Sequence, residues 1–330
     1  MAQNPDLIGR EILPIPDRPS KGKMALDARN AEFPAIKPLR PPEGAPNVVI
    51  VLFDDMGFGA PSVTGGPCHM PAMQKTHDDG LLYNRFHTTA LCSPTRQALL
   101  TGRNHHSAGM GSVAEVATGA PGNDSVRPNT VATIAEMLRL NGYNTGAVGK
   151  MHQTPTWEDS MSGPFDRWPT GDGFEKFYGF VGGETNQWAP TLFMGTTPVE
   201  PPGTPEDGYH ISEDIVDKAV SWVRGLHTMT PDKPFFLYCS FGATHAPHHV
   251  GQEWIDKYKG KFDKGWDAVR EETLANMKAK GVVPPDTELT GRPEGVMAWD
   301  ELNETQKTVY ARLMETYAGF AEHTLSLIHI

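Results

Sequence analysis

Two segments of the chain are almost purely apolar and are typical of strands buried inside a sheet. The first, residues 48–53, reads Val-Val-Ile-Val-Leu-Phe and stops at two aspartates, Asp54 and Asp55. The second, residues 235–241, follows Pro234 and is rich in aromatic side chains. Continuous β-branched or aromatic runs of this length predict strands that are covered on both faces.

Apolar residues at helical spacing predict three helices around these strands. The first is capped by Thr130 and ends at Asn141, the second starts near Ser212, and the third starts near Asn303 with Gln306 completing a capping box. Their expected apolar positions are Ile134, Met137 and Leu138; Ile215, Ala219, Trp222 and Leu226; and Val309, Leu313, Tyr317 and Phe320. Alternating strands and helices predict an α/β fold, with a mostly parallel or mixed sheet flanked by helices on both faces.

Two stretches lack such periodicity. Residues 1–46 are rich in proline and predict an extended N-terminal arm, so that the folded domain spans residues 47–330. Residues 251–300 are charged and interrupted by proline and glycine, and they predict a short helix with a long surface excursion.

Composition narrows the class of protein. The chain has 330 residues, is 38% hydrophobic and carries a net charge of −11, which allows a large core and argues against a nucleic-acid binder. Three cysteines, Cys68, Cys92 and Cys239, are too few and too scattered for a disulfide framework. With no apolar run of membrane length and no signal-peptide pattern at the N-terminus, we expect a cytoplasmic protein that does not enter a membrane, with the periplasm as the alternative location.

The strongest chemical signal is the string Cys92-Ser93-Pro94-Thr95-Arg96, followed by four residues and Thr101-Gly102. Pro94 in the first turn of a helix would place Cys92 at the helix N-terminus, where free N–H groups and the dipole favour negative charge. Arg96 would face the same point. For a lone cysteine, a buried structural role would be the simpler interpretation.

Acidic and basic side chains follow the predicted strands. Asp54 and Asp55 repel each other unless a cation lies between them or a backbone group caps them, although helix capping or a turn explains the pair about as well. Lys150 and His152 come after a predicted short strand over residues 143–148, where extended chain would point both side chains the same way. A surface lysine beside an unrelated histidine is the alternative.

Histidines and aromatic residues add further candidates. His245 lies beyond the second apolar strand, and with His248 and His249 it could belong to a metal cluster, but neither Cys68 nor Cys239 supplies the thiolate pair of a zinc site. Other possible pocket residues are His105, His106, Trp157, Trp168, Trp188 and Phe193. Core packing would explain the aromatic ones equally well.

Cys-x-Pro-x-Arg followed by four residues and Thr-Gly resembles the signature of the sulfatases, metal-dependent hydrolases of the alkaline-phosphatase-like superfamily. The resemblance, to bacterial cysteine-type arylsulfatases, implies that a maturation enzyme oxidises Cys92 to formylglycine, whose hydrate is the nucleophile. It also implies that Asp54, Asp55 and the modified Cys92 bind a divalent cation, most often Ca²⁺. Met151 stands where the family usually has Trp, in the spacer between Lys150 and His152.

The resemblance assigns the remaining roles as well. Arg96 would hydrogen-bond to the nucleophile, Lys150 would contact the sulfate, His152 would act as base, and His245 would protonate the leaving oxygen. The implied reaction is hydrolysis of a small sulfate monoester, in particular an aryl sulfate, to the phenol or alcohol and sulfate. A phosphonate or phosphate monoester hydrolase of the same superfamily and a non-catalytic fragment are the rival interpretations.

The resemblance extends to residues 314–320 and stops after Thr324. In the family a strand ending in Asp-Asn and a second sulfate-binding lysine follow, and neither is present here. We therefore expect a C-terminally truncated catalytic domain that binds calcium weakly, with residues 325–330 foreign to the original reading frame. A C-terminal segment that packs into the core is the alternative explanation of this apolar tail.

Overall fold

The computed structural model describes residues 22–328, and the chain divides into two compact units, Met1–Leu39 and Arg40–Ile330. In the first unit, Lys23 pairs with Glu32 in a β-bridge around a 3₁₀ helix, η1 (Ala28–Asn30). Residues 1–21 of the predicted arm and residues 329–330 of the predicted foreign tail lie outside the described residues.

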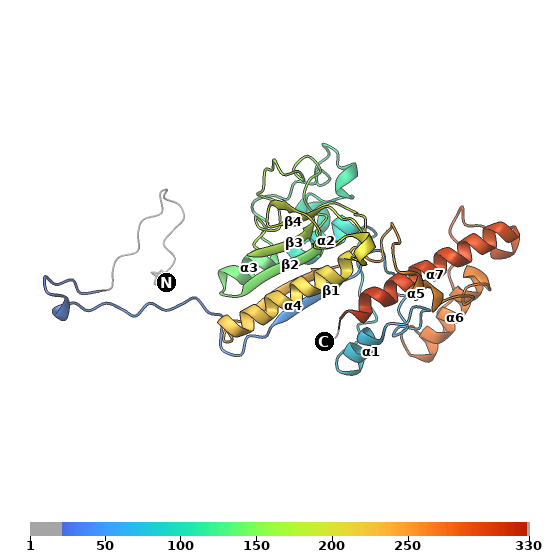
Figure 1. Cartoon of the computed structure of the whole chain (residues 1–330), viewed down its shortest axis with the longest axis horizontal. Coiled ribbons are helices and arrows are strands. Elements are labelled where there is room, and N and C mark those ends of the chain that lie inside the picture. Colours follow the sequence, from blue (N-terminus) through green and yellow to red (C-terminus); the bar gives the residue numbers. More distant parts are fainter. Residues whose placement is uncertain (1–21, 329–330) are drawn as a thin grey trace. The chain divides into compact units, whose positions relative to one another are not determined.

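The second unit contains a six-stranded mixed sheet, which confirms the predicted fold class (Figure 1). In spatial order the strands are β1 (Val48–Leu52), β6 (Phe235–Ser240), β2 (Asn144–Lys150), β3 (Lys176–Phe180), β4 (Leu192–Met194) and β5 (Thr197–Val199). The first four run parallel, and β4 and β5 are antiparallel. The carboxyl ends of β1, β6 and β2 therefore lie at one edge of the sheet, where ligands bind in open α/β folds.

Helices cover both faces of the sheet, namely α2 (Cys92–Thr101), α3 (Ile134–Leu140) and α4 (Ile211–Met229). Side chains alternate along β6, so Leu237 and Cys239 join the apolar cluster under α4. Phe236 and Tyr238 join the cluster on the opposite face, with α2 and α3. The central strand is thus buried on both faces, as its apolar run predicts.

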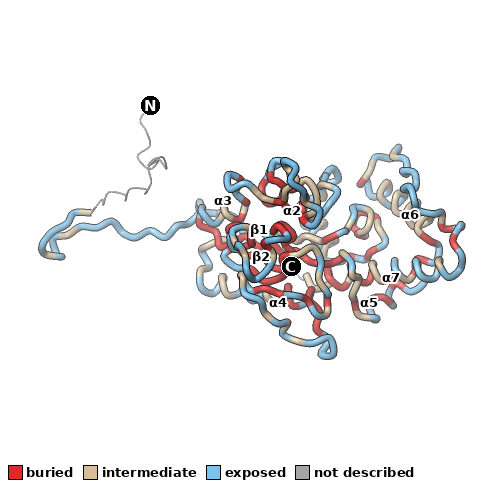
Figure 2. The backbone as a smooth tube through the Cα atoms, turned by 90° about the horizontal axis from the view of Figure 1, so that it is seen from above, coloured by how far each residue is buried: buried red, intermediate tan, exposed pale blue. Residues whose placement is uncertain are grey.

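A third apolar cluster draws residues from α1 (Pro71–Asp78), α6 (Gly265–Ala279), η5 (Trp299–Glu301) and α7 (Glu304–Ser326). The remaining helices are α5 (Gln252–Asp256) and the short η2 (His105–Ala108), η3 (Ala114–Val116) and η4 (Pro205–Asp207). Helix α7 contacts α1, α5 and α6 and buries Leu325 near its end (Figure 2). None of the helices in the described part of the chain is long and apolar enough to cross a membrane.

The structure corrects the prediction for the first strand. Within residues 22–328, β1 pairs only with β6, so it lies at the edge of the sheet, and Val49 is 46% exposed. An apolar run indicates burial on two faces only when neighbouring strands and helices complete the layers. The edge position of β1 was not predictable from its own residues.

The start of α3 and the helix content of residues 251–300 also differ from the sequence prediction. Thr133, not Thr130, caps α3, because its hydroxyl accepts a hydrogen bond from the N–H of Glu136 at 3.1 Å. Residues 251–300 contain the 15-residue α6 as well as the short α5, and so are more helical than predicted.

Helix α7 has the predicted capping box of Asn303 and Gln306, but Val309 and Leu313 are each 50% exposed. Its buried face instead includes small residues. A side chain at Gly319 would lie 2.8 Å from the Trp254 backbone, so α5 packs too closely for a larger residue there.

Candidate active site

Cys92 is the first residue of α2, with Pro94 in the first turn and Gly102 ending the helix in a left-handed conformation. This confirms the local structure predicted from the string. The thiol is half-buried, and its Sγ lies 3.1 Å from Nδ1 of His152. Burial raises the pKa of the Cys92 thiol, but the hydrogen bond to His152 and the charge of Lys150 outweigh burial and leave the pKa below its ordinary value.

Lys150 ends β2 and is completely buried. The preceding Gly149 has a φ of +92°, and a Cβ there would lie 1.9 Å from the carbonyl oxygen of Ser240. Only glycine permits this close approach of β2 to β6. The approach directs Lys150 to Asp54, whose Oδ2 accepts a hydrogen bond from Nζ.

Asp54 is shared by two cations. Its Oδ1 lies 3.3 Å from Nη2 of Arg96, while Lys150 holds its Oδ2. The Asp54 carbonyl accepts a 2.7 Å hydrogen bond from the backbone N–H of Thr244 in the loop after β6. Burial raises the pKa of Asp54, but the charges of Arg96 and Lys150 outweigh it and keep the carboxyl ionised well into acidic pH.

Arg96 is in α2, four residues after Cys92, and its guanidinium is buried. Its Nη1 donates to the Lys150 carbonyl at 3.1 Å, to the Tyr238 hydroxyl at 3.3 Å and to the Ser240 hydroxyl. Burial and the nearby Arg96 charge lower the pKa of Lys150, while Asp54 opposes that shift. Arg96 and Lys150 share the one carboxylate of Asp54, so the buried cluster carries one net positive charge. Such a cluster favours the binding of an anion.

His152 follows β2 with a φ of +51°, so it is not in extended chain and the prediction from strand alternation is wrong at this residue. Its backbone N–H donates to the Val181 carbonyl at 3.1 Å. On the ring, Nδ1 faces Cys92 and Nε2 lies 2.8 and 2.9 Å from the two carboxylate oxygens of Glu115. Burial lowers the pKa of His152, but these two contacts outweigh it and raise the pKa overall.

His245 reaches the same region from the loop after β6. Its Nε2 lies 3.6 Å from Oδ2 of Asp55, and its Nδ1 lies 2.6 Å from the Ala246 carbonyl and 3.9 Å from Glu184. Asp55 is an exposed residue whose φ is +52°. The structure thus brings Asp54, Cys92, Arg96, Lys150 and His152 together, with His245 and Asp55 at the exposed side.

The predicted metal ligands do not form a complete donor set. Both oxygens of Asp54 are held by basic side chains, Asp55 turns toward His245, and Cys92 contacts His152. Among residues 22–328 no three His, Cys, Asp or Glu side chains are grouped to hold a metal ion. Because Ca²⁺ requires six to eight oxygen ligands, this arrangement does not fit the ion.

Sequence reasoning missed three residues of the site. Tyr238 and Ser240 hydrogen-bond Arg96, and their spacing of two along an apolar strand is a signal that both hydroxyls share one face. Glu115 lies between the signature helix and α3, and no spacing or motif of the sequence marks it as a partner of His152.

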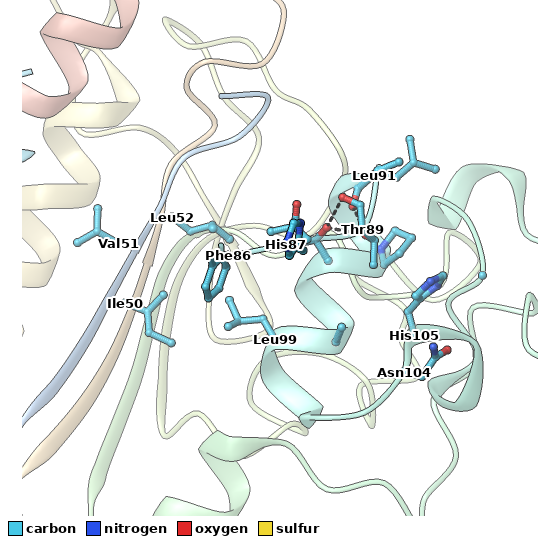
Figure 3. A pocket seen from close by; sticks show the side chains of 16 residues that line it. Ile50, Val51, Leu52, Phe86, His87, Thr89, Leu91, Leu99, Asn104 and His105 are labelled. Atoms are coloured by element: carbon cyan, nitrogen blue, oxygen red, sulfur yellow. Dashed lines mark hydrogen bonds between the residues drawn. The ribbon is translucent and has the colours of Figure 1, made fainter. Parts of the chain in front are cut away.

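The remaining candidates lie in different environments. His105 and Leu91 line a cavity of about 930 Å³ between the start of α2 and the edge strand β1 (Figure 3). His248 contacts the Tyr317 ring edge-on, and Trp168 packs edge-on against Phe193 in the core. Of the other aromatic candidates, Trp157 is exposed and Trp188 packs edge-on against the His210 ring.

Comparison with known proteins shows what the chain is similar to. The family model described as Sulfatase matches residues 46–324. An uncharacterized sulfatase of Schizosaccharomyces pombe is 31% identical over 301 residues, which is 84% of this chain and 52% of the relative. An arylsulfatase of Klebsiella aerogenes is 30% identical over 286 residues, which is 83% of this chain and 59% of the relative.

Solved structures share the fold. A structure of a Bacteroides fragilis protein described as a sulfatase superposes with a TM-score of 0.57 at 17% identity, covering 88% of this chain and 58% of that one. A protein in complex with its substrate D-glucosamine-2-N,6-O-disulfate superposes with a TM-score of 0.55 at 16% identity, covering 85% and 60%. The chain spans a little over half the length of the relatives it matches.

Proposed function

The chain belongs to the sulfatase family, and from this premise we propose that it hydrolyses sulfate monoesters, with Cys92 as the precursor of the nucleophile. The buried charge cluster carries the proposal: Lys150 and Arg96 share the single carboxylate of Asp54 beside Cys92. The one net positive charge that remains would be balanced by the anionic oxygens of a sulfate ester, and developing charge on these oxygens would be stabilised there.

Each side chain has a defined task in this proposal. Conversion of Cys92 to formylglycine by a maturation enzyme would supply an oxygen nucleophile in the form of its hydrate. Lys150 holds the sulfuryl oxygens, Arg96 hydrogen-bonds to the nucleophile, and His245 donates a proton to the departing ester oxygen. His152 accepts a proton from residue 92 at Nδ1, the ring atom that already faces the Cys92 side chain. No step is assigned to a divalent cation, because the donor set does not fit one.

Aryl sulfates are the proposed substrate class. The resemblance to an arylsulfatase at 30% identity supports this choice. A nitrophenyl ester is therefore a suitable probe, because its good leaving group makes hydrolysis easy to detect. Nitrophenolate is a good leaving group, so its departure depends less on proton donation by His245 than the departure of an alcohol would.

The experiment has two parts. The protein is produced in a host with a formylglycine-generating enzyme, and the peptide containing residue 92 is analysed by mass spectrometry, with Cys92→Ser as the unmodified control. Hydrolysis of nitrophenyl sulfate and nitrophenyl phosphate is then compared. An aldehyde at residue 92 with faster sulfate hydrolysis supports the proposal. An unmodified thiol without hydrolysis would identify a non-catalytic protein, and faster phosphate hydrolysis would identify a phosphate monoester hydrolase.

A further inference from the structure

Glu115 joins the site by placing both of its carboxylate oxygens against His152. Both of its carboxylate oxygens lie within hydrogen-bond distance of Nε2, at 2.9 and 2.8 Å. The other ring nitrogen, Nδ1, lies 3.1 Å from Sγ of Cys92. The imidazole therefore connects Glu115 directly to the residue that carries the nucleophile.

The elements around this contact hold both partners in place. A Cβ at Gly183 would lie 2.8 Å from Oε1 of Glu115 and 2.8 Å from Cε1 of His152, so the chain after β3 packs directly against the pair. The backbone of η3 is tied to the start of α2, because the N–H of Ala114 donates to the hydroxyl of Ser93 at 3.4 Å. Glu115, His152 and Cys92 are thus positioned relative to one another by backbone contacts.

The chemistry of a carboxylate selects one form of the neutral imidazole. An ionised carboxylate only accepts hydrogen bonds, so Nε2 must carry the proton when it faces Glu115. The lone pair then lies on Nδ1, toward residue 92. The hydrogen bond that Glu115 accepts from His152 also lowers the pKa of the Glu115 carboxyl, which favours its ionised form.

A purely structural ion pair is the alternative explanation. The Glu115 side chain is 47% exposed, and exposed pairs contribute little to folding stability. A pair that served folding alone would lower the unfolding free energy when Glu115 is removed, but the ring proton would stay on Nε2 because other contacts hold it there. The response of that proton to the loss of Glu115 therefore distinguishes the two explanations.

We propose that Glu115 is a positioning residue that orients His152 and keeps its proton on Nε2, so that Nδ1 is the atom that takes a proton from residue 92. This inference rests on the proposed function for its role in catalysis. When residue 92 gives up its hydroxyl proton, Nδ1 gains that proton and the ring becomes an imidazolium whose Nε2–H still donates to Glu115. Glu115 stays ionised throughout and transfers no proton itself.

The test is the ¹⁵N spectrum of the full chain labelled at histidine, in a Cys92→Ser background. The serine hydroxyl stands in for a hydroxyl of the modified residue and does not ionise in the range of the experiment. At a pH where the imidazole is neutral, the His152 signals are assigned by their loss in His152→Gln. We expect a protonated, pyrrole-type signal for Nε2 and an unprotonated, pyridine-type signal for Nδ1.

Glu115→Ala is expected to move both His152 signals toward intermediate values, because the ring then exchanges between its two neutral forms. The matched control is Glu213→Ala, which removes a second carboxylate–histidine pair, Glu213 with His323 at 3.2 Å, and should leave the His152 signals in place. Unchanged His323 signals in Glu115→Ala show that this variant is folded.

A proton on Nδ1 of His152 before the substitution, or unchanged His152 signals in Glu115→Ala, would overturn the proposal. The spectrum requires neither formylglycine nor turnover, so its outcome is independent of the outcome for sulfate hydrolysis.

Discussion

Two buried histidines should make the stability of this protein strongly dependent on pH. His210 and His323 are almost fully buried between α4 and α7, with ring centroids 4.6 Å apart. Burial lowers the pKa of each to about 4, and in His210 the neighbouring His323 contributes to the shift. The ordinary pKa of histidine is about 6.5. Between these values the unfolded chain binds more protons than the folded one, so stability falls as the pH drops below about 6.5.

The size of the effect follows from the two pKa values. A histidine that shifts from about 6.5 unfolded to about 4 folded lowers the unfolding free energy by about 2 kcal/mol between about pH 7.5 and pH 5. Total stabilities of domains are about 5 to 15 kcal/mol, so one residue changes a large fraction of the whole.

The perturbation is His323→Gln, because His210 also caps α4 by accepting a hydrogen bond from the N–H of Ser212. Urea unfolding of the wild type and the variant at both pH values gives the free energies. We expect the loss of stability on acidification to be smaller by about 2 kcal/mol in His323→Gln. The control is His227→Gln at an exposed position of α4, which should retain the wild-type difference.

Comparing variants is necessary because other groups titrate in the same range. Burial raises the pKa of Asp172 to about 6, so this carboxyl stabilises the folded state as the pH falls. That contribution is the same in every variant and cancels in the difference. Identical pH dependence in His323→Gln and the wild type would refute the reasoning that burial holds His323 neutral.

Three further predictions follow from the site and its surroundings. Arg96→Ala leaves Asp54 and Lys150 in an incomplete buried cluster, and urea unfolding should show a loss of about 3 to 5 kcal/mol. Gly149→Ala should lose about 3 kcal/mol or more, because its Cβ would overlap the Ser240 carbonyl at a positive φ. The control Gly225→Ala in α4 has open space and should gain about 1 kcal/mol, and equal effects at the two glycines would contradict the explanation. Calorimetric titration with calcium should give a Kd weaker than about 10⁻³ M, since basic side chains hold both oxygens of Asp54, and tight stoichiometric binding would disprove that account.

Much of the local structure around the site was predictable from the sequence, because short-range rules determine it. The start of α2 at Cys92, the buried strand β6 and the capping box of Asn303 with Gln306 depend on proline geometry, apolar runs and neighbouring side chains. The signature string and the residues after each strand likewise indicated side chains that lie close together in the structure, among them Cys92, Lys150 and Asp54.

Other features depend on contacts between distant parts of the chain. Glu115 meets His152 across 37 positions of the sequence, and nothing in the residues around Glu115 indicates that contact. His152 leaves extended geometry because its backbone N–H bonds to Val181, and this turns the ring toward Cys92. The edge position of β1 was likewise decided by which strands pair.

The sequence by itself determined the fold class and the family, since apolar periodicity and a contiguous motif are written into neighbouring residues. Only the tertiary structure decided that Lys150 and Arg96 would share Asp54 and that Glu115 would face Nε2 of His152. The physical reason is that burial and pairing of charges depend on which strands and loops pack together, and a charge has no defined environment until they do.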